Sequence, residues 1–376
     1  MHALTWERAA AWRASRHHLD RRAPAGSLLA VASRLCGLHA QVLSCAALTA
    51  WARIEDWERG AVERALWEER RLVKTWAMRG TLHLLPADEL PLWHGALSTS
   101  PRYLRSRAWQ NYFGMTLAEL DRFTQAVGTA LDGQMMTREE LAREIVRITG
   151  KRKYGTTLAE SSWGTILKPA AFAGHLCFAP GDGQRVRFTR PDTWLGVARP
   201  PLAPEQAVRE VTRRFLAAYG PATARDLARW WTGGGVTSAR QWLAALKDEI
   251  CQVEIEGVPA WILAPDAREL RDFTPARSVR LLPGFDQYVV GASHHAERLL
   301  PGDCRGRVYR PQGWISPVLL VNGKMAGVWR HTIKGSRVEV AIERFGALPL
   351  WARRGAAIEA ERLGAFLGCK ASLVWA

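Results

Sequence analysis

The sequence lacks the features of a membrane or secreted protein. No uninterrupted apolar run approaches the roughly 18 residues that a spanning helix needs, and residues 1–22 carry charges between Trp6 and Trp12 instead of the apolar core of a signal peptide. The six cysteines show no Cys-x-x-Cys pair, which argues against a zinc site or a cluster and favours reduced thiols. We therefore expect a cytoplasmic protein with no membrane contact, metal or cofactor.

Acidic residues are also scarce. The 52 Lys and Arg exceed the 36 Asp and Glu and leave a net charge of +16, which favours a polyanionic partner, with nucleic acid as the leading candidate. A GC-rich genome would explain part of the arginine excess but not this imbalance. A hydrophobic content of 48% excludes disorder, and 376 residues suffice for two or three compact units. Most of the 18 tryptophans must be core, although some can wedge between bases or stack on them.

A helix–helix–hairpin pattern recurs three times and predicts three tandem winged-helix units at 1–115, 116–200 and 201–275. Winged-helix units also mediate protein contacts, so the repeat favours DNA without proving it. The expected helices and hairpin strands lie at 28–53, 62–66, 73–78 and 81–85 in the first unit; at 138–148, 164–176, 177–179 and 185–189 in the second; and at 224–231, 237–246, 253–255 and 260–263 in the third. The second unit opens on a capping box, Thr137 to Glu140.

Residues 276–376 have a different hydrophobic pattern. Short alternating segments at 279–282, 318–321, 324–330 and 337–342 predict strands, and Asn322-Gly323 is a specific hairpin signal. A helix is expected at 351–367. The fold class is thus α+β, with three tandem winged-helix units followed by a C-terminal β-rich domain that ends in a helix.

The segment His39-Ala40-Gln41 carries the strongest chemical signal. Helical spacing at 28–38 leads to Gly37, a typical helix-ending residue, and a new apolar run begins after Gln41. On an extended chain, residues two apart share one face, so His39 and Gln41 could hold and deprotonate one water molecule. The alternative is a helix–helix joint whose polar side chains merely cap backbone groups.

Three stretches resemble the AlkZ/YcaQ-type bacterial DNA glycosylases: Cys-Gly-Leu-His-Ala-Gln-Val-Leu-Ser at 36–44, Arg-Gly-Thr-Leu-His-Leu-Leu-Pro at 79–86, and Leu-Leu-Pro-Gly-Phe-Asp-Gln-Tyr at 281–288. The resemblance covers most of the chain. That family uses Gln-apolar-Gln or Gln-apolar-Asp as its catalytic pair. This sequence looks like the His-apolar-Gln variant of antibiotic self-resistance glycosylases. Because Gln41 cannot be a base, the catalytic role of each residue of the pair stays open.

The resemblance implies hydrolysis of the N-glycosidic bond of N7-alkylguanine, including bulky antibiotic adducts, in double-stranded DNA. His39 and Gln41 would be catalytic, and His39 would act as the base. No lysine lies beside the motif, so we expect a monofunctional enzyme. Bulky intercalating adducts would be hard to extrude, so we expect limited or no base flipping.

DNA-binding candidates are the cations of the wings and hairpins, where phosphate contacts are expected. They are Arg79, His83, Lys168, Arg185, Arg187, Lys324, Arg330, His331, Lys334 and Arg337. Each has a plainer alternative: arginine stems can cover apolar wing surface, and His83 can be an internally bonded strand residue. Asp286 could cap backbone at a domain joint or face the DNA.

A different class of function also fits the pattern. A winged-helix transcription regulator would bind DNA without catalysis, and it would be a dimer on a palindromic operator. No long dimerisation helix is evident in the sequence, so we expect a monomer.

Overall fold

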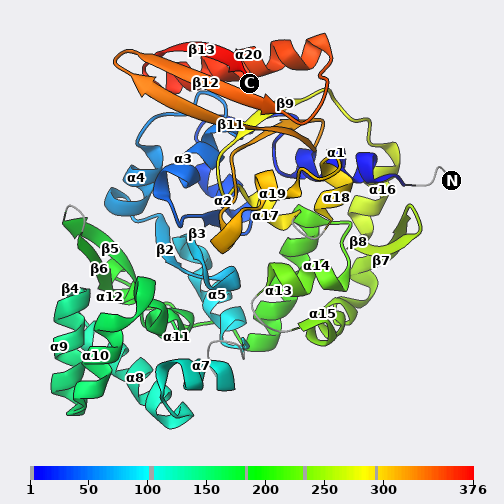
Figure 1. The fold of residues 1–376 in the computed structure, drawn as a ribbon. Coiled ribbons are helices and arrows are strands. Elements are labelled where there is room, and N and C mark those ends of the chain that lie inside the picture. Colours follow the sequence, from blue (N-terminus) through cyan, green and yellow to red (C-terminus); the bar gives the residue numbers. More distant parts are fainter. Residues whose placement is uncertain (1–3, 101–105, 183–184, 232–234, 293–294) are drawn as a thin grey trace. The chain divides into compact units, whose positions relative to one another are not determined.

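The computed structural model describes residues 4–100, 106–182, 185–231, 235–292 and 295–376. The chain forms two compact units, each assembled from separate stretches. Unit 1 comprises Met1–Val62, Arg213–Asp226 and Leu246–Ala376, and unit 2 comprises Glu63–Thr212 and Leu227–Ala245. Figure 1 shows their elements by chain position. In the described part of the chain, no helix has the length and apolar character needed to cross a membrane.

A five-stranded sheet dominates the C-terminal part of unit 1. Its strand order is β13-β12-β11-β10-β9, with antiparallel pairs throughout except for the parallel pair of β12 and β13. The strands are β9 (Val279–Leu282), β10 (Val318–Val321), β11 (Lys324–Lys334), β12 (Arg337–Arg344) and β13 (Lys370–Trp375). Helix α20 (Leu350–Leu367) packs against β9 and β13, as Figure 1 shows. The buried side chains of β9 and β10 lie in the hydrophobic core of this unit.

The turn between β10 and β11 is the hairpin that the sequence predicted. Asn322 and Gly323 both have left-handed backbone angles, with φ of 49° and 78°, which is the pattern of a type I′ turn. A Cβ atom at Gly323 would lie 2.6 Å from the carbonyl oxygen of Ala10. Glycine is therefore required here both for conformation and for close packing on α1 (Trp6–Arg16).

Two details of the C-terminal domain differ from the sequence prediction. The chain does not end in the helix at 351–367, because β13 follows it and pairs in parallel with the edge of β12. In addition, β11 continues to Lys334, where the sequence predicted an end at Arg330. Cross-strand pairs such as Ile333 with Val338 extend this hairpin, so its cations lie on strands instead of in a turn.

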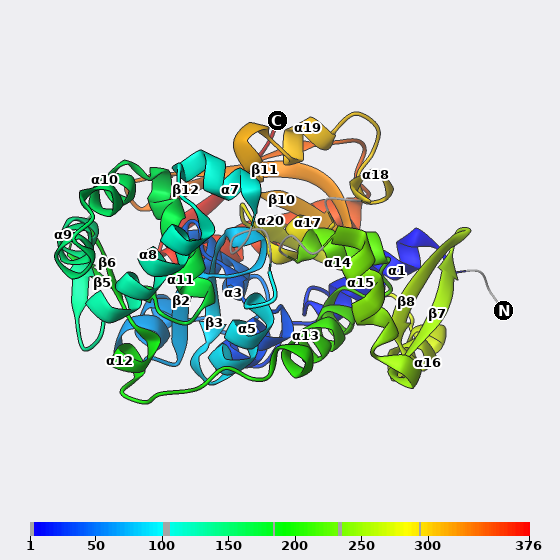
Figure 2. The same cartoon turned by 90° about the horizontal axis from the view of Figure 1, so that it is seen from below.

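The rest of unit 1 is largely helical. Its remaining helices and short strand are α1, α2 (Leu28–Arg34), β1 (Leu38–His39), α3 (Leu43–Trp51), α16 (Ala264–Asp272), α17 (Gln287–Gly291), α18 (Ala296–Leu299) and α19 (Arg305–Val308). The predicted hairpin is present as β7 (Ile250–Ile255) and β8 (Val258–Leu263), but both strands are longer than expected and the turn has two residues, Glu256 and Gly257. Figure 2 shows α16 beside this hairpin.

Unit 2 contains the predicted hairpins and one revised helix pair. Its main elements are β2 (Leu72–Trp76), β3 (Leu82–Pro86), α5 (Leu90–Leu97), α7 (Arg107–Phe113), α8 (Leu117–Ala130), β4 (Met135–Thr137), α9 (Arg138–Thr149), α10 (Arg152–Glu160), α11 (Lys168–Phe172), β5 (Cys177–Asp182), β6 (Arg185–Thr189), α12 (Pro191–Leu195) and α15 (Gly235–Ala244). The capping box of Thr137 and Glu140 opens α9 as predicted.

The helix predicted at 164–176 is wrong in extent. A short 3₁₀ segment (Ser162–Leu167) and the five-residue α11 occupy this region. Gly164 and Gly174 adopt left-handed angles, with φ of 65° and 76°, and so interrupt the helix on both sides. The helix that packs on α9 is α10, which the sequence analysis did not identify.

The mixed α+β class is confirmed, whereas the tandem winged-helix interpretation and the boundaries at 115, 200 and 275 stay predictions. Among the described elements, three helices contain residues of both units. They are α4 (Ala61–Glu63), α13 (Pro204–Tyr219) and α14 (Ala224–Trp230). Along the chain, α14, α15, β7 and β8 follow one another in the order predicted for the third unit. The sequence predicts a turn at Gly233-Gly234-Gly235 between the first two helices of that unit, and Gly233 and Gly234 lie outside the described residues.

Candidate active site

His39 lies on an extended stretch between two helices, as the sequence predicted. Helix α2 ends at Arg34, and Gly37 follows with a left-handed φ of 95° while its N–H donates to the carbonyl of Ala32 at 2.7 Å. Strand β1 then covers Leu38 and His39, and α3 begins at Leu43. The helix break therefore turns the chain so that His39 is held in extended backbone.

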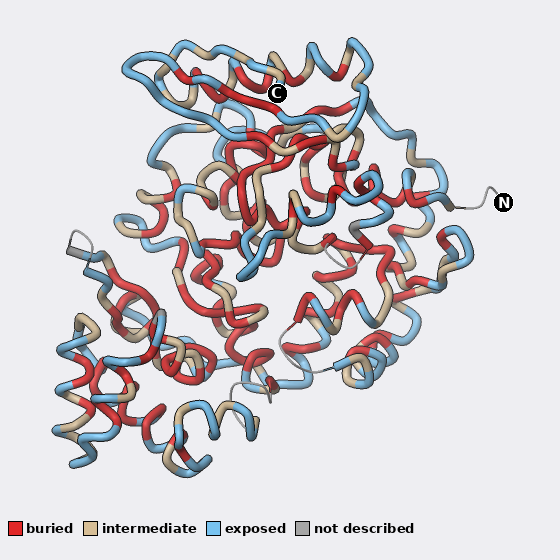
Figure 3. Tube along the Cα trace, viewed as in Figure 1, coloured by how far each residue is buried: buried red, intermediate tan, exposed pale blue. Residues whose placement is uncertain are grey.

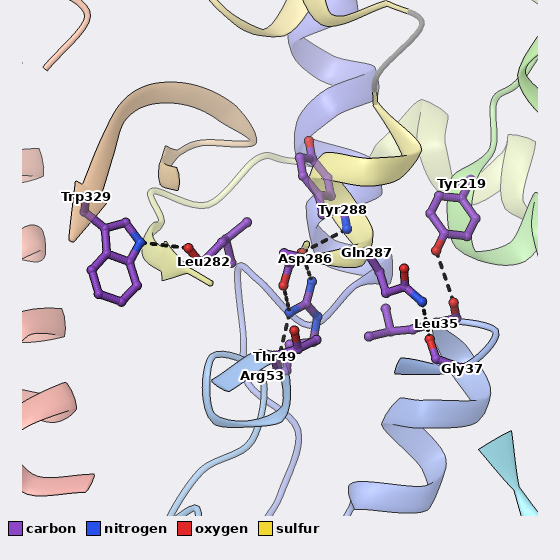
Figure 4. Close-up of polar contacts among 10 residues, drawn as sticks. All are labelled: Leu35, Gly37, Thr49, Arg53, Tyr219, Leu282, Asp286, Gln287, Tyr288 and Trp329. Atoms are coloured by element: carbon purple, nitrogen blue, oxygen red, sulfur yellow. Dashed lines mark hydrogen bonds and ion pairs between the residues drawn. The ribbon is translucent and has the colours of Figure 1, made fainter. Parts of the chain in front are cut away.

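The turn before His39 is held by two side chains from distant parts of the chain. The Tyr219 hydroxyl donates to the carbonyl oxygen of Leu35 at 3.1 Å, and the Gln287 side-chain amide donates to the carbonyl oxygen of Gly37 (Figure 4). Gln287 is buried at the start of α17. Buried hydrogen bonds at two carbonyls restrict the backbone that leads into His39.

The imidazole of His39 is stacked on an aromatic ring. The rings of His39 and Phe285 lie 5.1 Å apart between centroids, with 4° between their planes. Phe285 in turn contacts Trp314, with 5.2 Å between ring centroids. Phe285 has a left-handed φ of 60°, which is strained for a bulky residue and turns its ring onto His39. The orientation of the imidazole is thus set from the segment 284–288.

Asp286 is a buried structural carboxylate. Its two oxygens accept hydrogen bonds from Arg53 at 2.7 and 2.8 Å, and one of them also accepts from the backbone N–H of Tyr288 at 2.9 Å (Figure 4). Neither Asp286 nor Arg53 has exposed surface. Of the two alternatives left open by the sequence, the structure has the capping one, because Asp286 caps α17 and anchors the end of α3.

Several titratable groups around this segment are neutral at pH 7. Burial lowers the pKa of His17 well below its ordinary value. Burial raises the pKa of Tyr288, whose hydroxyl donates to the carbonyl oxygens of Ala10 and Gly323 at 3.1 and 2.7 Å. The pKa of Cys45 is also raised, first by burial and then by Asp286. Because Arg53 and Asp286 are shielded from water, the attraction between their charges is stronger than it would be at the surface.

Gln41 is exposed in the bend between β1 and α3, while His39 is 5% exposed. That both side chains bind one water molecule stays a prediction. Among the described residues, no group of three or more His, Cys, Asp or Glu side chains is arranged to hold a metal ion.

The cationic candidates of unit 1 lie along one long hairpin. Arg330, His331, Lys334 and Arg337 are exposed near its far end, on β11 and β12 (Figure 3). Lys324 begins β11 at the other end and lies 3.4 Å from the Glu7 carboxylate. The structure therefore groups four of these residues and separates Lys324 from them.

The candidates of unit 2 are split between exposed and buried positions. Arg185 is exposed on β6, and half-buried Arg187 donates to the carbonyl oxygen of Met135 at 3.3 Å. Lys168 is half-buried at the first position of α11.

The pair from the first predicted wing is held internally. The Arg79 guanidinium donates to the carbonyl oxygen of Trp230 at 2.9 Å and lies 3.3 Å from the imidazole of His83. His83 is on β3, has no exposed surface, and its Nδ1 lies 3.0 Å from the carbonyl oxygen of Thr81. A DNA contact by either residue stays a prediction.

Sequence reasoning missed the supporting residues Tyr219, Phe285, Gln287 and Trp314. The stretch at 281–288 was recognised as a motif, yet the contacts of Asp286 with Arg53 and of Gln287 with Gly37 join residues 233 and 250 positions apart. Turn-forming Pro311 and Gly313 before Trp314 were the one local signal for the loop that carries this tryptophan.

Comparisons with known proteins agree over nearly the whole chain. The family described as DNA glycosylase AlkZ-like matches residues 32–366. The chain is 36% identical over 332 residues to an interstrand DNA cross-link repair glycosylase of Streptomyces sahachiroi, with 86% of this chain and 87% of that relative covered. It also matches the solved structure of Streptomyces sahachiroi DNA glycosylase AlkZ with a TM-score of 0.87 and 34% identity, over 99% of this chain and 100% of that one. The matched range includes His39, Gln41 and the segment 284–288.

Proposed function

The chain belongs to the AlkZ-like DNA glycosylase family, and we propose that it hydrolyses the N-glycosidic bond of N7-alkylated guanine in double-stranded DNA, bulky antibiotic adducts included. DNA glycosylases act on DNA, and the net charge of +16 suits that partner. The purpose would be self-resistance or DNA repair.

The observation that carries the proposal is the presentation of His39. Imidazole is a side-chain group that can act as a base at neutral pH. That of His39 lies on extended backbone and is oriented by stacking on Phe285. A general base must be held within hydrogen-bond reach of the proton that it takes, and a rigid support of this kind is what such a role needs.

Alkylation at N7 gives the guanine a positive charge, so the base is already a good leaving group. In the proposed reaction, His39 accepts a proton from water while the water oxygen bonds to C1′ of the sugar. The C1′–N9 bond breaks, and its electron pair leaves with the base, which neutralises the ring charge. The base role supplies typically about 10²- to 10⁴-fold in rate.

Gln41 is assigned the second role at the site. Its carbonyl oxygen would orient the same water molecule, or its amide would contact the phosphate beside the reacting nucleotide. Its exposed position after β1 leaves it accessible to DNA. Gln41 has no acidic proton to exchange near pH 7, so the base role falls to His39.

The test uses a duplex with one N7-methylguanine. Wild-type protein should release the methylated base, and alkali should then cleave the strand at that position, whereas an unmethylated duplex should stay intact. Binding to both duplexes without cleavage at the modified guanine would favour the alternative, a winged-helix transcription regulator. A palindromic preference in binding would support that alternative further.

Interstrand cross-links between guanine N7 atoms are a second proposed substrate. The support is the 36% identical Streptomyces relative, whose name describes cross-link repair. A duplex cross-linked by a nitrogen mustard should separate into single strands on a denaturing gel after incubation with the protein. Persistent cross-linked duplex, with N7-methylguanine still excised, would limit the activity to monoadducts.

A further inference from the structure

Trp314 is the most exposed tryptophan among those whose side chains the structure describes. Its exposed fraction is 54%, whereas Trp51, Trp93 and Trp329 are almost fully buried. Leaving so large an apolar ring in water is unfavourable, since burying a side chain of this size stabilises a fold by about 2 kcal/mol or more. The exposed face of this ring, beside the candidate active site, is therefore available to stack on a bound ligand.

A small rigid hairpin carries this ring. Residues Tyr309 and Ile315 form a β-bridge, and the N–H of Arg310 donates to the carbonyl oxygen of Trp314 at 2.8 Å. At the tip, Gln312 and Gly313 both have left-handed backbone angles, with φ of 60° and 78°, as in a type I′ turn. The turn matches the strand twist, so Trp314 is held on a defined scaffold and not on a loose loop.

The hairpin is packed directly against the segment that supports His39. A Cβ atom at Gly284 would lie 3.0 Å from the carbonyl oxygen of Ile315, so the two backbones approach closely. The next residue, Phe285, contacts both the Trp314 ring at 5.2 Å and the His39 ring at 5.1 Å between centroids. Trp314 is thus one ring away from the proposed base.

Cations flank the hairpin. Exposed Arg310 follows the bridged Tyr309, and together with Arg307, Arg330 and Glu343 it lines an open groove of about 520 Å³. Glu343 pairs with Arg307, while Arg310 and Arg330 have exposed side chains. An aromatic face next to arginines is the combination that binds nucleic acid, because bases stack and phosphates pair with guanidinium groups.

We infer that Trp314 wedges into a base step of the bound duplex, next to the nucleotide held at His39, and stacks on the nucleobase face that this opens. The inference rests on the proposed glycosylase function and adds a substrate-positioning residue to it. Arg310 contacts the adjoining phosphate. Every nucleobase has a face on which an aromatic ring can stack, so this contact does not depend on sequence. Trp314 therefore sets the depth and position of the duplex at His39 and does not read sequence.

Substitution of Trp314 tests the inference on a duplex with one N7-methylguanine. Trp314→Ala should weaken duplex binding by about 5- to 150-fold, which is the range for loss of one base–aromatic stack. Trp314→Phe should retain most of the affinity, and Trp314→Leu should behave like alanine. The matched control is Ile358→Ala, which removes an exposed apolar side chain on α20 (62% exposed) and should bind like wild type.

A purely structural role for Trp314 predicts different results. Leucine would then rescue as well as phenylalanine, because both fill the space against Phe285, and affinity would change with thermal stability. That pattern, or a Trp314→Ala variant with wild-type affinity, overturns the inference. If wild-type protein releases no methylated base from any duplex, the proposed function itself fails, which separates the two failures.

Photo-crosslinking supplies a direct readout. A 5-iodouracil next to the N7-methylguanine should crosslink to the peptide containing Trp314 on irradiation, when the catalytically impaired His39→Ala variant is used to keep the duplex intact. Crosslinks that map solely to other peptides contradict the stacking assignment.

Discussion

The guanidinium of Arg53 binds both carboxylate oxygens of Asp286, at 2.7 and 2.8 Å, and neither side chain has exposed surface. This pair ties the end of α3 to the start of α17. The first of these helices follows His39 and the second follows Phe285, so the pair links the segments that carry the candidate base and the ring that it stacks on.

Asp286→Ala should destabilise the protein by about 3–5 kcal/mol, because it strands a buried guanidinium without its partner. Chemical denaturation of the variant measures the loss. The double variant Arg53→Met, Asp286→Leu removes both charges and should recover much of the stability. If the double variant is no more stable than Asp286→Ala, the unpaired Arg53 charge is not the cause of the lost stability.

His39→Ala should lower single-turnover excision of N7-methylguanine by about 100-fold or more and leave duplex affinity near wild type, since the loss lies in the chemical step. His39→Gln should keep partial activity, because the family's more common motif has Gln at that position. A His39→Ala variant as active as wild type would remove His39 from the mechanism.

The excision rate should depend on a single proton. A histidine base works in its neutral form, so the rate should fall as the pH is lowered and His39 takes up a proton. Single-turnover rates between pH 5 and 8 provide the measurement. A flat profile would mean that His39 is not the base and that catalysis depends on Gln41 and on electrostatic stabilisation of the sugar cation.

Replacing Arg185 and Arg187 together by Ala should weaken binding to all duplex sequences alike. The slope of log K against log salt should become shallower by roughly 2, about one unit for each lost phosphate contact. The control is Arg143→Ala with Arg147→Ala, two exposed arginines on α9 of the same unit. Loss of thermal stability with an unchanged salt slope would mean that the wing arginines only cover apolar surface.

The stability of the fold should fall in mild acid because of His94. Burial lowers the pKa of His94 to about 4, with a smaller effect of His175. The unfolded chain binds a proton near pH 6.5, so this contribution is fully present above that pH and is lost as the pH falls toward 4, a loss of about 3 kcal/mol. His94→Gln should flatten the dependence of unfolding free energy on pH between 6.5 and 4.5; an unchanged slope would assign the acid sensitivity to other groups.

Local signals predicted the elements that depend on neighbouring residues. The break at Gly37, the extended His39, the turn at Asn322-Gly323 and the bounds of β9 and β10 all follow from glycine placement and short-range hydrophobic pattern. The cap on α17 by Asp286 was among the alternatives for the same reason.

Long-range packing decided the rest. Strand β13 was missed because its pairing with β12 requires the intervening α20, and nothing local marks a parallel partner. The stack of Phe285 on His39 joins residues far apart in the chain, so no spacing rule could reveal it. The helix expected at 164–176 was too long because Gly164 and Gly174 both adopt left-handed angles, which the hydrophobic pattern does not reveal.

The hydrogen bond from Gln287 to Gly37 also constrains how the enzyme is made. Its donor lies 250 residues after its acceptor, which corresponds to about 10–50 s of synthesis at 5–20 residues per second. During that interval a nascent chain carries His39 without the Phe285 ring and without this bond. We therefore expect a nascent chain to become active only after the segment 284–288 has left the ribosome, and chains terminated before this segment to release no base from DNA.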